Sequence, residues 1–205
     1  MREIAVRDGR PGDAETAARL IREAGDLLMD FLAGFRGRAE TENVLEALWN
    51  VPGTRFSRES ARVVLAEDKP AGLLIGYPRQ AITGLDRGTG RALLSLGGFA
   101  LASAVLRHPF LTWRMSTLPE AEPGDWYVCV LATLEKFRGR GIGSALLEDA
   151  EARARERGAG ALSLLVAEGN APARSLYAKH GFRERGRFTV AGRTSLRMGK
   201  PLGPA

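Results

Sequence analysis

Apolar and polar residues recur along the chain with two periods, one typical of strands and one typical of amphipathic helices. Short apolar runs next to turn-forming residues predict strands. Runs with apolar positions three and four residues apart predict helices, which begin at capping residues and end at glycine or proline. The first part of the chain contains a strand over Glu3–Val6, a turn-rich link over Asp8–Asp13, a helix from the N-cap Asp13 to Glu23, an apolar continuation over Leu27–Phe35, a helix over Ala39–Asn50, and two strands over Arg62–Glu67 and Ala71–Tyr77 joined by a hairpin turn.

Strands and helices alternate in the last part of the chain. Apolar runs predict strands over Trp126–Thr133 and Leu162–Val166, and an amphipathic pattern predicts a helix over Ala145–Arg157. Another helix and two further strands follow. On the helix over Ala145–Arg157, acidic residues stand four positions before basic ones, which predicts i,i+4 ion pairs. These expected pairs are Asp149 with Arg153 and Glu151 with Arg155.

The segment Pro78–Asp125 is long for a connection between two strands, and it is more apolar than a solvated loop. Its pattern predicts a helix over Leu93–Leu106 and a short turn within Pro109–Met115. Three interpretations stay open: a lid or wall for a substrate pocket, a homodimer contact, or a helical hairpin packed on the domain's own sheet. The order of elements predicts one domain over residues 1–205, with residues 78–125 as a helical insertion before the fourth strand.

The composition is that of an ordinary globular protein, with 205 residues, 44% hydrophobic and 26% charged. The N-terminus has no signal-peptide pattern, and Leu93–Leu106 is shorter than the ~20 residues that span a bilayer. We therefore expect a cytoplasmic protein without a membrane partner. The single cysteine, Cys129, excludes an intramolecular disulfide and a cysteine-based zinc cluster, and no other metal-ligand cluster is evident. Within an apolar strand, it is expected to be a buried, inert thiol.

The net charge of +6 is unevenly distributed. Residues 1–135 contain 16 Lys+Arg and 18 Asp+Glu, a balance of −2, whereas residues 136–205 contain 14 and 6, a balance of +8. An excess of positive charge favours an anionic ligand. The arginines are not interleaved with aromatic residues in a nucleic-acid-binding module, so we expect no nucleic-acid partner.

The most informative segment is the glycine-rich turn Arg138–Ser144, between a predicted strand and a predicted helix. Such a turn directs several unpaired backbone N–H groups at one point, together with the positive end of the helix dipole. Glycine at positions 139, 141 and 143 lets the backbone approach a ligand closely and adopt φ > 0. Arg138 and Arg140 add charged donors. We expect this turn to hold a phosphate or diphosphate.

Other interpretations of the turn fit less well. A Walker-type loop ends in Gly-Lys-Ser/Thr, but here Gly143 precedes Ser144 without a lysine. A dinucleotide fingerprint is G-x-G-x-x-G, whereas this turn is G-x-G-x-G. Glu168, after the next apolar run, could take the part of a ribose-binding acid, so a dinucleotide site is the main competitor. The plainest alternative is an ordinary turn with solvated arginines.

A second motif follows in Asn170–Phe182. Asn170 is a good helix N-cap, and Gly181 is a good C-terminal stop. Tyr177 lies seven residues after Asn170, about two helical turns, so both side chains address one face. Arg-x-x-Gly-x-Gly and Asn-x-x-Ala-x-x-x-Tyr-x-x-x-Gly-Phe together resemble the GCN5-related N-acetyltransferase (GNAT) family, most closely over Trp126–Phe182.

The resemblance implies an α/β fold with a mixed, mostly antiparallel, twisted sheet of six to seven strands flanked by helices, and acetyl-CoA (coenzyme A) as the cofactor. It implies that the strand before the turn pairs with the pantetheine arm, that the turn holds the pyrophosphate, and that Tyr177 is the catalytic acid for the leaving sulfur. A phenol with a pKa of about 10 matches a thiolate leaving group. A core aromatic is the alternative role. The residues expected to bind the coenzyme are Leu131, Ala132, Thr133, Arg138, Gly139, Arg140, Gly141, Ile142, Gly143, Ser144, Asn170 and Tyr177.

The group that accepts the amine's proton is not evident, because the strands on either side of the turn contain no acid. Glu168, Asp125 and Glu122 near strand ends are candidates, and a water relay fits equally well. His180, at a helix C-terminus, is explained by the helix dipole. We expect an acetyl-CoA-dependent N-acetyltransferase that acts on a primary amine of a small molecule, protein or peptide. The alternatives are a non-catalytic acyl-CoA-binding sensor with the same fold and a dinucleotide-binding protein.

Overall fold

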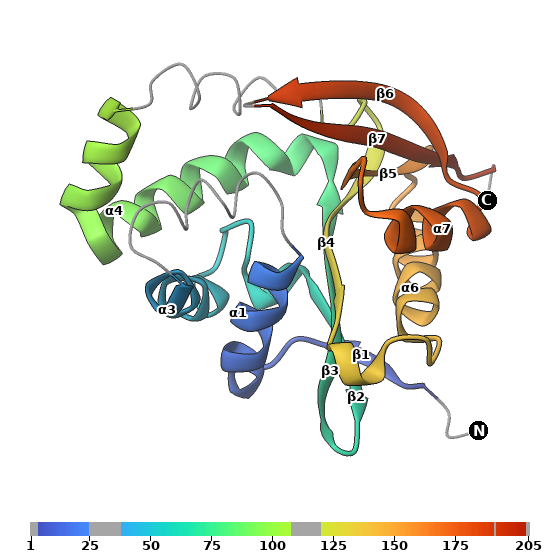
Figure 1. Ribbon diagram of the computed structural model, residues 1–205, viewed down its shortest axis with the longest axis horizontal. Coiled ribbons are helices and arrows are strands. Elements are labelled where there is room, and N and C mark those ends of the chain that lie inside the picture. The colour runs from blue at the N-terminus through green and yellow to red at the C-terminus, as the bar shows by residue number, and fades with distance from the viewer. Residues whose placement is uncertain (1–3, 25–37, 108–119, 191, 204–205) are drawn as a thin grey trace.

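The computed structural model of the protein describes residues 4–24, 38–107, 120–190 and 192–203. A seven-stranded sheet runs through its centre in the order β1-β2-β3-β4-β5-β7-β6 (Figure 1). Neighbouring strands are antiparallel except β4 and β5, which are parallel. The expected mixed, mostly antiparallel sheet is therefore confirmed. The strands are β1 (Val6–Asp8), β2 (Ala61–Ala66), β3 (Lys69–Pro78), β4 (Asp125–Thr133), β5 (Ala161–Ala167), β6 (Arg183–Val190) and β7 (Arg193–Pro201).

The helices cover both faces of the sheet (Figure 1). One face carries α1, α3 and α4, whose core includes the fully buried Leu45, Trp49 and Ile75. The other carries α6 and α7, whose core includes Leu146, Leu147 and Leu162. Burying apolar side chains on both faces gives two layers of helices around one sheet. The helices are α1 (Ala14–Glu23), α3 (Arg38–Trp49), α4 (Ile82–Arg107), α6 (Ile142–Glu156) and α7 (Ala171–Lys179).

The N-terminal elements differ from the expectation in their bounds. Where the sequence predicts a strand over Glu3–Val6, the described residues form β1 over Val6–Asp8, because Asp8 pairs in register with Arg62 of β2, and Glu3 lies outside the described residues. Asp13 does not cap α1 with its side chain. Its carboxylate accepts both terminal nitrogens of Arg7 at 2.7 Å and the backbone N–H of Arg10 at 2.8 Å. A bidentate ion pair outweighs a single capping bond, so Asp13 stabilises the turn before the helix instead.

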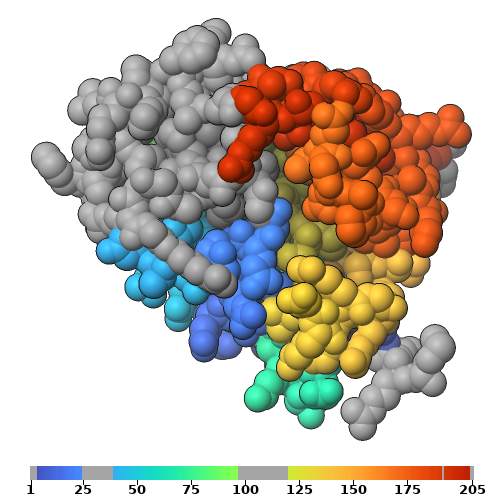
Figure 2. Space-filling view, viewed as in Figure 1, coloured from blue at the N-terminus to red at the C-terminus, as the bar shows by residue number. Residues whose placement is uncertain are grey.

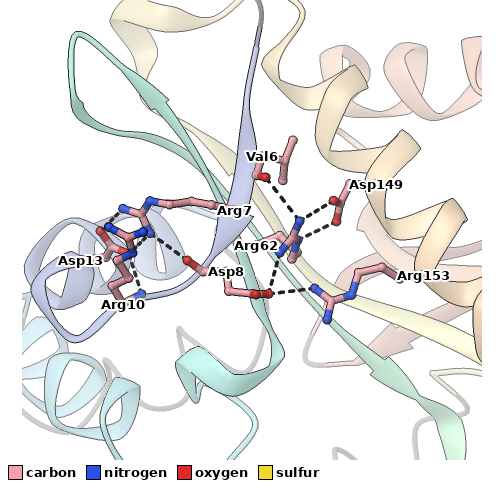
Figure 3. A network of polar contacts seen from close by, with 8 residues as sticks. All are labelled: Val6, Arg7, Asp8, Arg10, Asp13, Arg62, Asp149 and Arg153. Carbon is pink, nitrogen blue, oxygen red and sulfur yellow. Dashed lines mark hydrogen bonds and ion pairs between the residues drawn. The ribbon is translucent and has the colours of Figure 1, made fainter.

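A second arginine network fastens the first two strands to α6 (Figure 3). Arg62 donates two hydrogen bonds to Asp149, at 2.8 and 2.7 Å, and one to Asp8 at 2.6 Å. Arg153 donates to the same Asp8 at 3.1 Å. The expected pair of Asp149 with Arg153 is therefore wrong, because a half-buried, bidentate guanidinium takes the carboxylate. The other expected i,i+4 pair, between Glu151 and Arg155, is confirmed at 2.7 Å.

The insertion is helical over most of its described length. Helix α4 spans 26 residues and starts well before the expected Leu93–Leu106. Its first turns contain three glycines, which mask the helical pattern in the sequence. Gly88 is required there, since a Cβ would lie 2.0 Å from the carbonyl oxygen of Gly53. The segments Leu27–Phe35 and Pro109–Met115 lie outside the described residues. No helix in the part of the chain that the structure describes is long and apolar enough to cross a membrane.

Candidate active site

A cleft of about 650 Å³ opens where β4 and β5 separate. The two strands pair only from Asp125–Val128 to Ala161–Leu164, and beyond those residues they diverge. Residues 128–133 and 164–167 line the cleft from its two sides. Figure 2 shows β4 (olive) set back between α1 (blue), α6 with its preceding turn (yellow) and α7 (orange). Backbone groups that these strand ends do not use for sheet pairing can bind an extended ligand with amide groups.

Strand β4 contains a bulge at the mouth of this split. Ile75 of β3 pairs with Val130, and the next residue, Gly76, pairs with Val128, so Cys129 is the extra residue. A bulge bends its strand and redirects side chains. Cys129 is half-buried and lines the cleft. The expected burial of this thiol is therefore only partial, at the position where the strand bulges.

The glycine-rich turn lies at one end of the cleft, and its backbone amides are available. Gly139 and Gly141 have φ of 74° and 85°, which only glycine adopts at little cost. Gly141 is the N-cap of α6, and its carbonyl accepts the first helical bond, from Ala145, at 3.0 Å. Within the described structure, the amides of residues 139–144 donate no hydrogen bond. These free donors at the positive end of a 15-residue helix fit a diphosphate.

Two residues of the turn have other roles than expected. Gly143 has no positive φ, but a Cβ there would lie 2.9 Å from Leu176 Cδ2, so this glycine permits the close packing of α6 on α7. Arg140 does not line the cleft. Its guanidinium lies over the Phe137 ring, 5.4 Å from the centroid. Arg138 does line the cleft, where its Nε donates to the Thr133 carbonyl at 3.2 Å.

A contact that the sequence did not reveal joins the turn to α7. His180 Nε2 lies 2.9 Å from Ser144 Oγ, so the end of α7 is hydrogen-bonded to the first turn of α6. The helix dipole therefore does not account for the main contact of His180, which is its hydrogen bond with Ser144. This bond fixes the Ser144 hydroxyl next to the free amides.

The two side chains predicted on α7 both reach the cleft. Asn170 caps the helix, as expected, because its Oδ1 accepts the Ala173 amide at 3.2 Å. Tyr177 is 7% exposed, and burial raises the pKa of its hydroxyl to about 12. Its hydroxyl has no hydrogen-bond partner among the described residues, and its ring packs 5.7 Å from that of Phe182. Tyr177 is thus a protonated donor at neutral pH, next to open space.

The structure brings all but one of the predicted coenzyme residues to a single cleft. The exception is Arg140. The predicted residues that line it are Leu131, Ala132, Thr133, Arg138, Gly139, Gly141, Ile142, Gly143, Ser144, Asn170 and Tyr177.

None of the three candidate proton acceptors lines the cleft. Glu168 forms an ion pair with Arg187, Asp125 is buried and accepts the Glu122 amide at 3.0 Å, and Glu122 accepts Arg197 at 2.8 Å. Among the residues that the structure describes, the acid that does line the cleft is Glu23, the last residue of α1. The sequence gives no signal for it, because only tertiary packing sets α1 against β4.

Arg55 forms the wall of the cleft on the side of α1. It is 6% exposed, and its guanidinium binds Asp86 of α4 and, at 2.6 Å, Glu120. Its backbone N–H donates to Thr89 Oγ1 at 2.9 Å. The two carboxylates neutralise the buried cation and fasten the insertion to the cleft. No described residue of the insertion lines the cleft itself. Ile82 and Ala92 of α4 instead belong to the core on this face of the sheet, which favours, among the three interpretations, helical structure packed on the domain's own sheet.

Comparisons with known proteins identify the family and the fold. Residues 26–182 match the family model described as the acetyltransferase (GNAT) family. A solved structure described only as an acetyltransferase is 25% identical, with a TM-score of 0.74 over 97% of this chain and 99% of that one. An N-acetyltransferase from Staphylococcus aureus Mu50 is 20% identical, with a TM-score of 0.73 over 95% and 99%. The PaiA N-acetyltransferase from Thermoplasma acidophilum, solved with coenzyme A, is 16% identical, with a TM-score of 0.54 over 97% and 99%. No curated protein matches the chain.

Proposed function

The chain belongs to the acetyltransferase (GNAT) family, whose cofactor is acetyl-CoA, and we propose that it acetylates a primary amine of a small molecule or a peptide. One observation carries this proposal. The free amides of residues 139–144 and the unpartnered hydroxyl of Tyr177 lie in the same cleft, which follows the split between β4 and β5. An elongated ligand with a diphosphate at one end and a thioester at the other fits that arrangement.

Each group has a chemical task. The amides of the turn and Arg138 would hold the diphosphate, and the backbone of Leu131–Thr133 would pair with the amide-bearing arm and polarise the thioester carbonyl. Asn170 has amide hydrogens left for the same arm, since its capping bond uses only the oxygen. Tyr177 would protonate the departing sulfur. When bound, acetyl-CoA supplies the activated acetyl group.

Coenzyme binding is the first test. We expect coenzyme A to raise the Tm of the protein, because a ligand that binds only the folded state stabilises it, and NAD to leave the Tm unchanged. The matched variant is Gly141→Ala, which places a side chain at φ 85° and is expected to weaken the coenzyme-induced shift. Stabilisation by NAD rather than by coenzyme A would support a dinucleotide-binding protein instead.

Turnover is the second test. Thiol release from acetyl-CoA is measured with a panel of small amines and short peptides. Amine-dependent release supports an acetyltransferase. Binding of coenzyme A without release, with every amine and with water, would instead support the non-catalytic sensor.

A further inference from the structure

On the side of α1, the described residues that line the cleft include one carboxylate, that of Glu23. Glu23 ends α1, which borders the hollow in Figure 2, and its side chain is 22% exposed. It is the only acid among the described residues that line the cleft. Beside it, the apolar Ile21, Ala24 and Phe56 and the ion-paired Arg55 also line the cleft. A carboxylate set in an apolar wall at the rim of a cleft suits a small cation.

The present partners of Glu23 do not prevent ligand binding. Arg19 Nε lies 3.0 Å from the carboxylate and Arg22 Nη2 lies 3.9 Å from it. The Arg19 side chain is 59% exposed, so water screens its i,i+4 ion pair with Glu23 and the pair contributes little. Arg22 has Glu42 as a closer partner. An ammonium ion in the cleft can therefore replace Arg19 at little cost.

The other charges in the cleft do not compete for a cationic acceptor. Arg55 is neutralised by Asp86 and Glu120. Arg138 and Lys179, the other cations among the described residues that line the cleft, belong to the glycine-rich turn and to α7, on the coenzyme side. Positive and negative charge are thus separated along the cleft, and the negative end is the end at α1.

We propose that the acceptor binds as its ammonium ion at Glu23 and that the Glu23 carboxylate takes its first proton. This inference rests on the proposed acetyl transfer. The freed lone pair attacks the thioester carbonyl carbon, a C–N bond forms and the C–S bond breaks. Tyr177 gives its proton to the sulfur, and the second amine proton restores the phenol. Glu23 passes the first proton to water, so the products are an amide, a thiol and one proton.

The pH dependence of kcat/KM distinguishes this role from a structural one. The probe amines are glycinamide, whose α-amino group titrates near pH 8, and butylamine, which titrates like lysine, near about 10.4. Wild type uses the abundant ammonium form, whereas Glu23→Gln has to use the free amine. At pH 7 we therefore expect a deficit of about tenfold with glycinamide and of more than about a thousandfold with butylamine. The deficit disappears above the pKa of each amine.

Matched variants isolate the proton acceptor. Glu23→Asp keeps a carboxylate and is expected to retain the wild-type profile with a lower kcat. Glu168→Gln removes an acid outside the cleft and is expected to behave as wild type. Cys129→Ser removes a titratable thiol from the cleft wall, so its contribution to the profile is measured separately. Among the described residues, the charged or titratable groups near Glu23 are Arg19 and Arg22 of α1 and, through Arg22, Glu42 of α3, while Arg55 and Cys129 line the same cleft.

If neither probe amine is a substrate, the rate of acetyl-CoA hydrolysis is measured in the absence of any amine. Slow hydrolysis of acetyl-CoA places water where the amine would be, and Glu23→Gln is expected to lower this rate at pH 7. Parallel pH profiles for wild type and Glu23→Gln, or equal hydrolysis rates, would overturn the inference. A wild-type protein that neither binds coenzyme A nor releases its thiol would refute the proposed function itself, which is a different result.

Discussion

Tyr177 keeps its proton because its phenol is removed from water. Burial raises the pKa from 10.0 to about 12, so the hydroxyl remains a donor at neutral and mildly alkaline pH. Tyr177→Phe is expected to lower kcat about 100-fold, the size of a lost general acid, and to change the Kd of coenzyme A little. The ratio of wild-type to variant kcat should stay constant up to about pH 9, because Tyr177 does not titrate in that range. Equal turnover would remove Tyr177 from the acid role.

The raised pKa of Tyr177 also makes the free energy of unfolding depend on pH. A group whose pKa is higher in the folded state gives its full contribution below the unfolded pKa and loses it as pH rises. For Tyr177 that loss falls between pH 10.0 and about 12. Chemical denaturation of wild type and Tyr177→Phe across this range measures it, and the variant is expected to lose less stability.

Single residues also show where prediction from sequence stops. The motif residues around Gly141 and Tyr177 were predictable, because their spacing alone brings them to one turn and one helix face. The position of Arg140 was not predictable, since its guanidinium packs over the ring of Phe137 and not into the cleft. Glu23 was not either, because its place in the cleft follows from packing between segments more than 100 residues apart.

At the scale of elements, the position of the glycine-rich turn depends on how closely α6 packs on β3. A Cβ at Gly72 would lie 2.4 Å from Ile142 Cγ2 and 3.3 Å from Leu146 Cδ1. Ile142 is the first residue of α6, so a side chain at Gly72 pushes the turn away from the sheet. We expect Gly72→Ala to cost about 1–3 kcal/mol by overpacking, which lowers Tm by about 2–4 °C per kcal/mol.

The same variant tests whether this packing serves the coenzyme. Gly72→Ala is expected to raise the Kd of coenzyme A in calorimetric titrations, although Gly72 does not line the cleft. Gly160→Ala is the control, because nothing lies within 4 Å of its Cβ and its φ is not positive. A lower Tm with an unchanged Kd would show that the turn keeps its geometry independently of β3.

Element order was predictable because hydrophobic periodicity and turn residues specify it locally, whereas the sheet type was predicted from the family resemblance. The bounds of α4 were not predictable, because the glycines in its first turns suggest a break in the helix. In the structure the helix continues through them, and Gly88 is needed for the close approach to Gly53. The split between β4 and β5 was not predictable either. Both strands are apolar along their whole length, and only the pairing register shows where they separate.

At the scale of the whole molecule, the uneven distribution of charge along the sequence places a basic part and a mildly acidic part of the chain on the two sides of the cleft. Residues 136–205, with 14 basic and 6 acidic side chains, supply α6, α7 and the turn. Residues 1–135, with 16 basic and 18 acidic side chains, supply α1 and the wall of the cleft on the side of α1. The cleft therefore lies between a basic part and a mildly acidic part, which suits an anionic coenzyme on one side and a cationic amine on the other.

This division predicts different responses to salt. Coenzyme affinity is expected to fall steeply between low and high ionic strength, because screening acts on several positive charges around a multiply charged anion. The KM of an amine held by one carboxylate is expected to change less. Arg138→Gln should flatten the salt dependence of the coenzyme Kd, since Arg138 lines the cleft, whereas Arg183→Gln, an exposed residue of β6 outside it, should not. Equal slopes for both variants would mean that the overall positive field, rather than the turn, attracts the coenzyme.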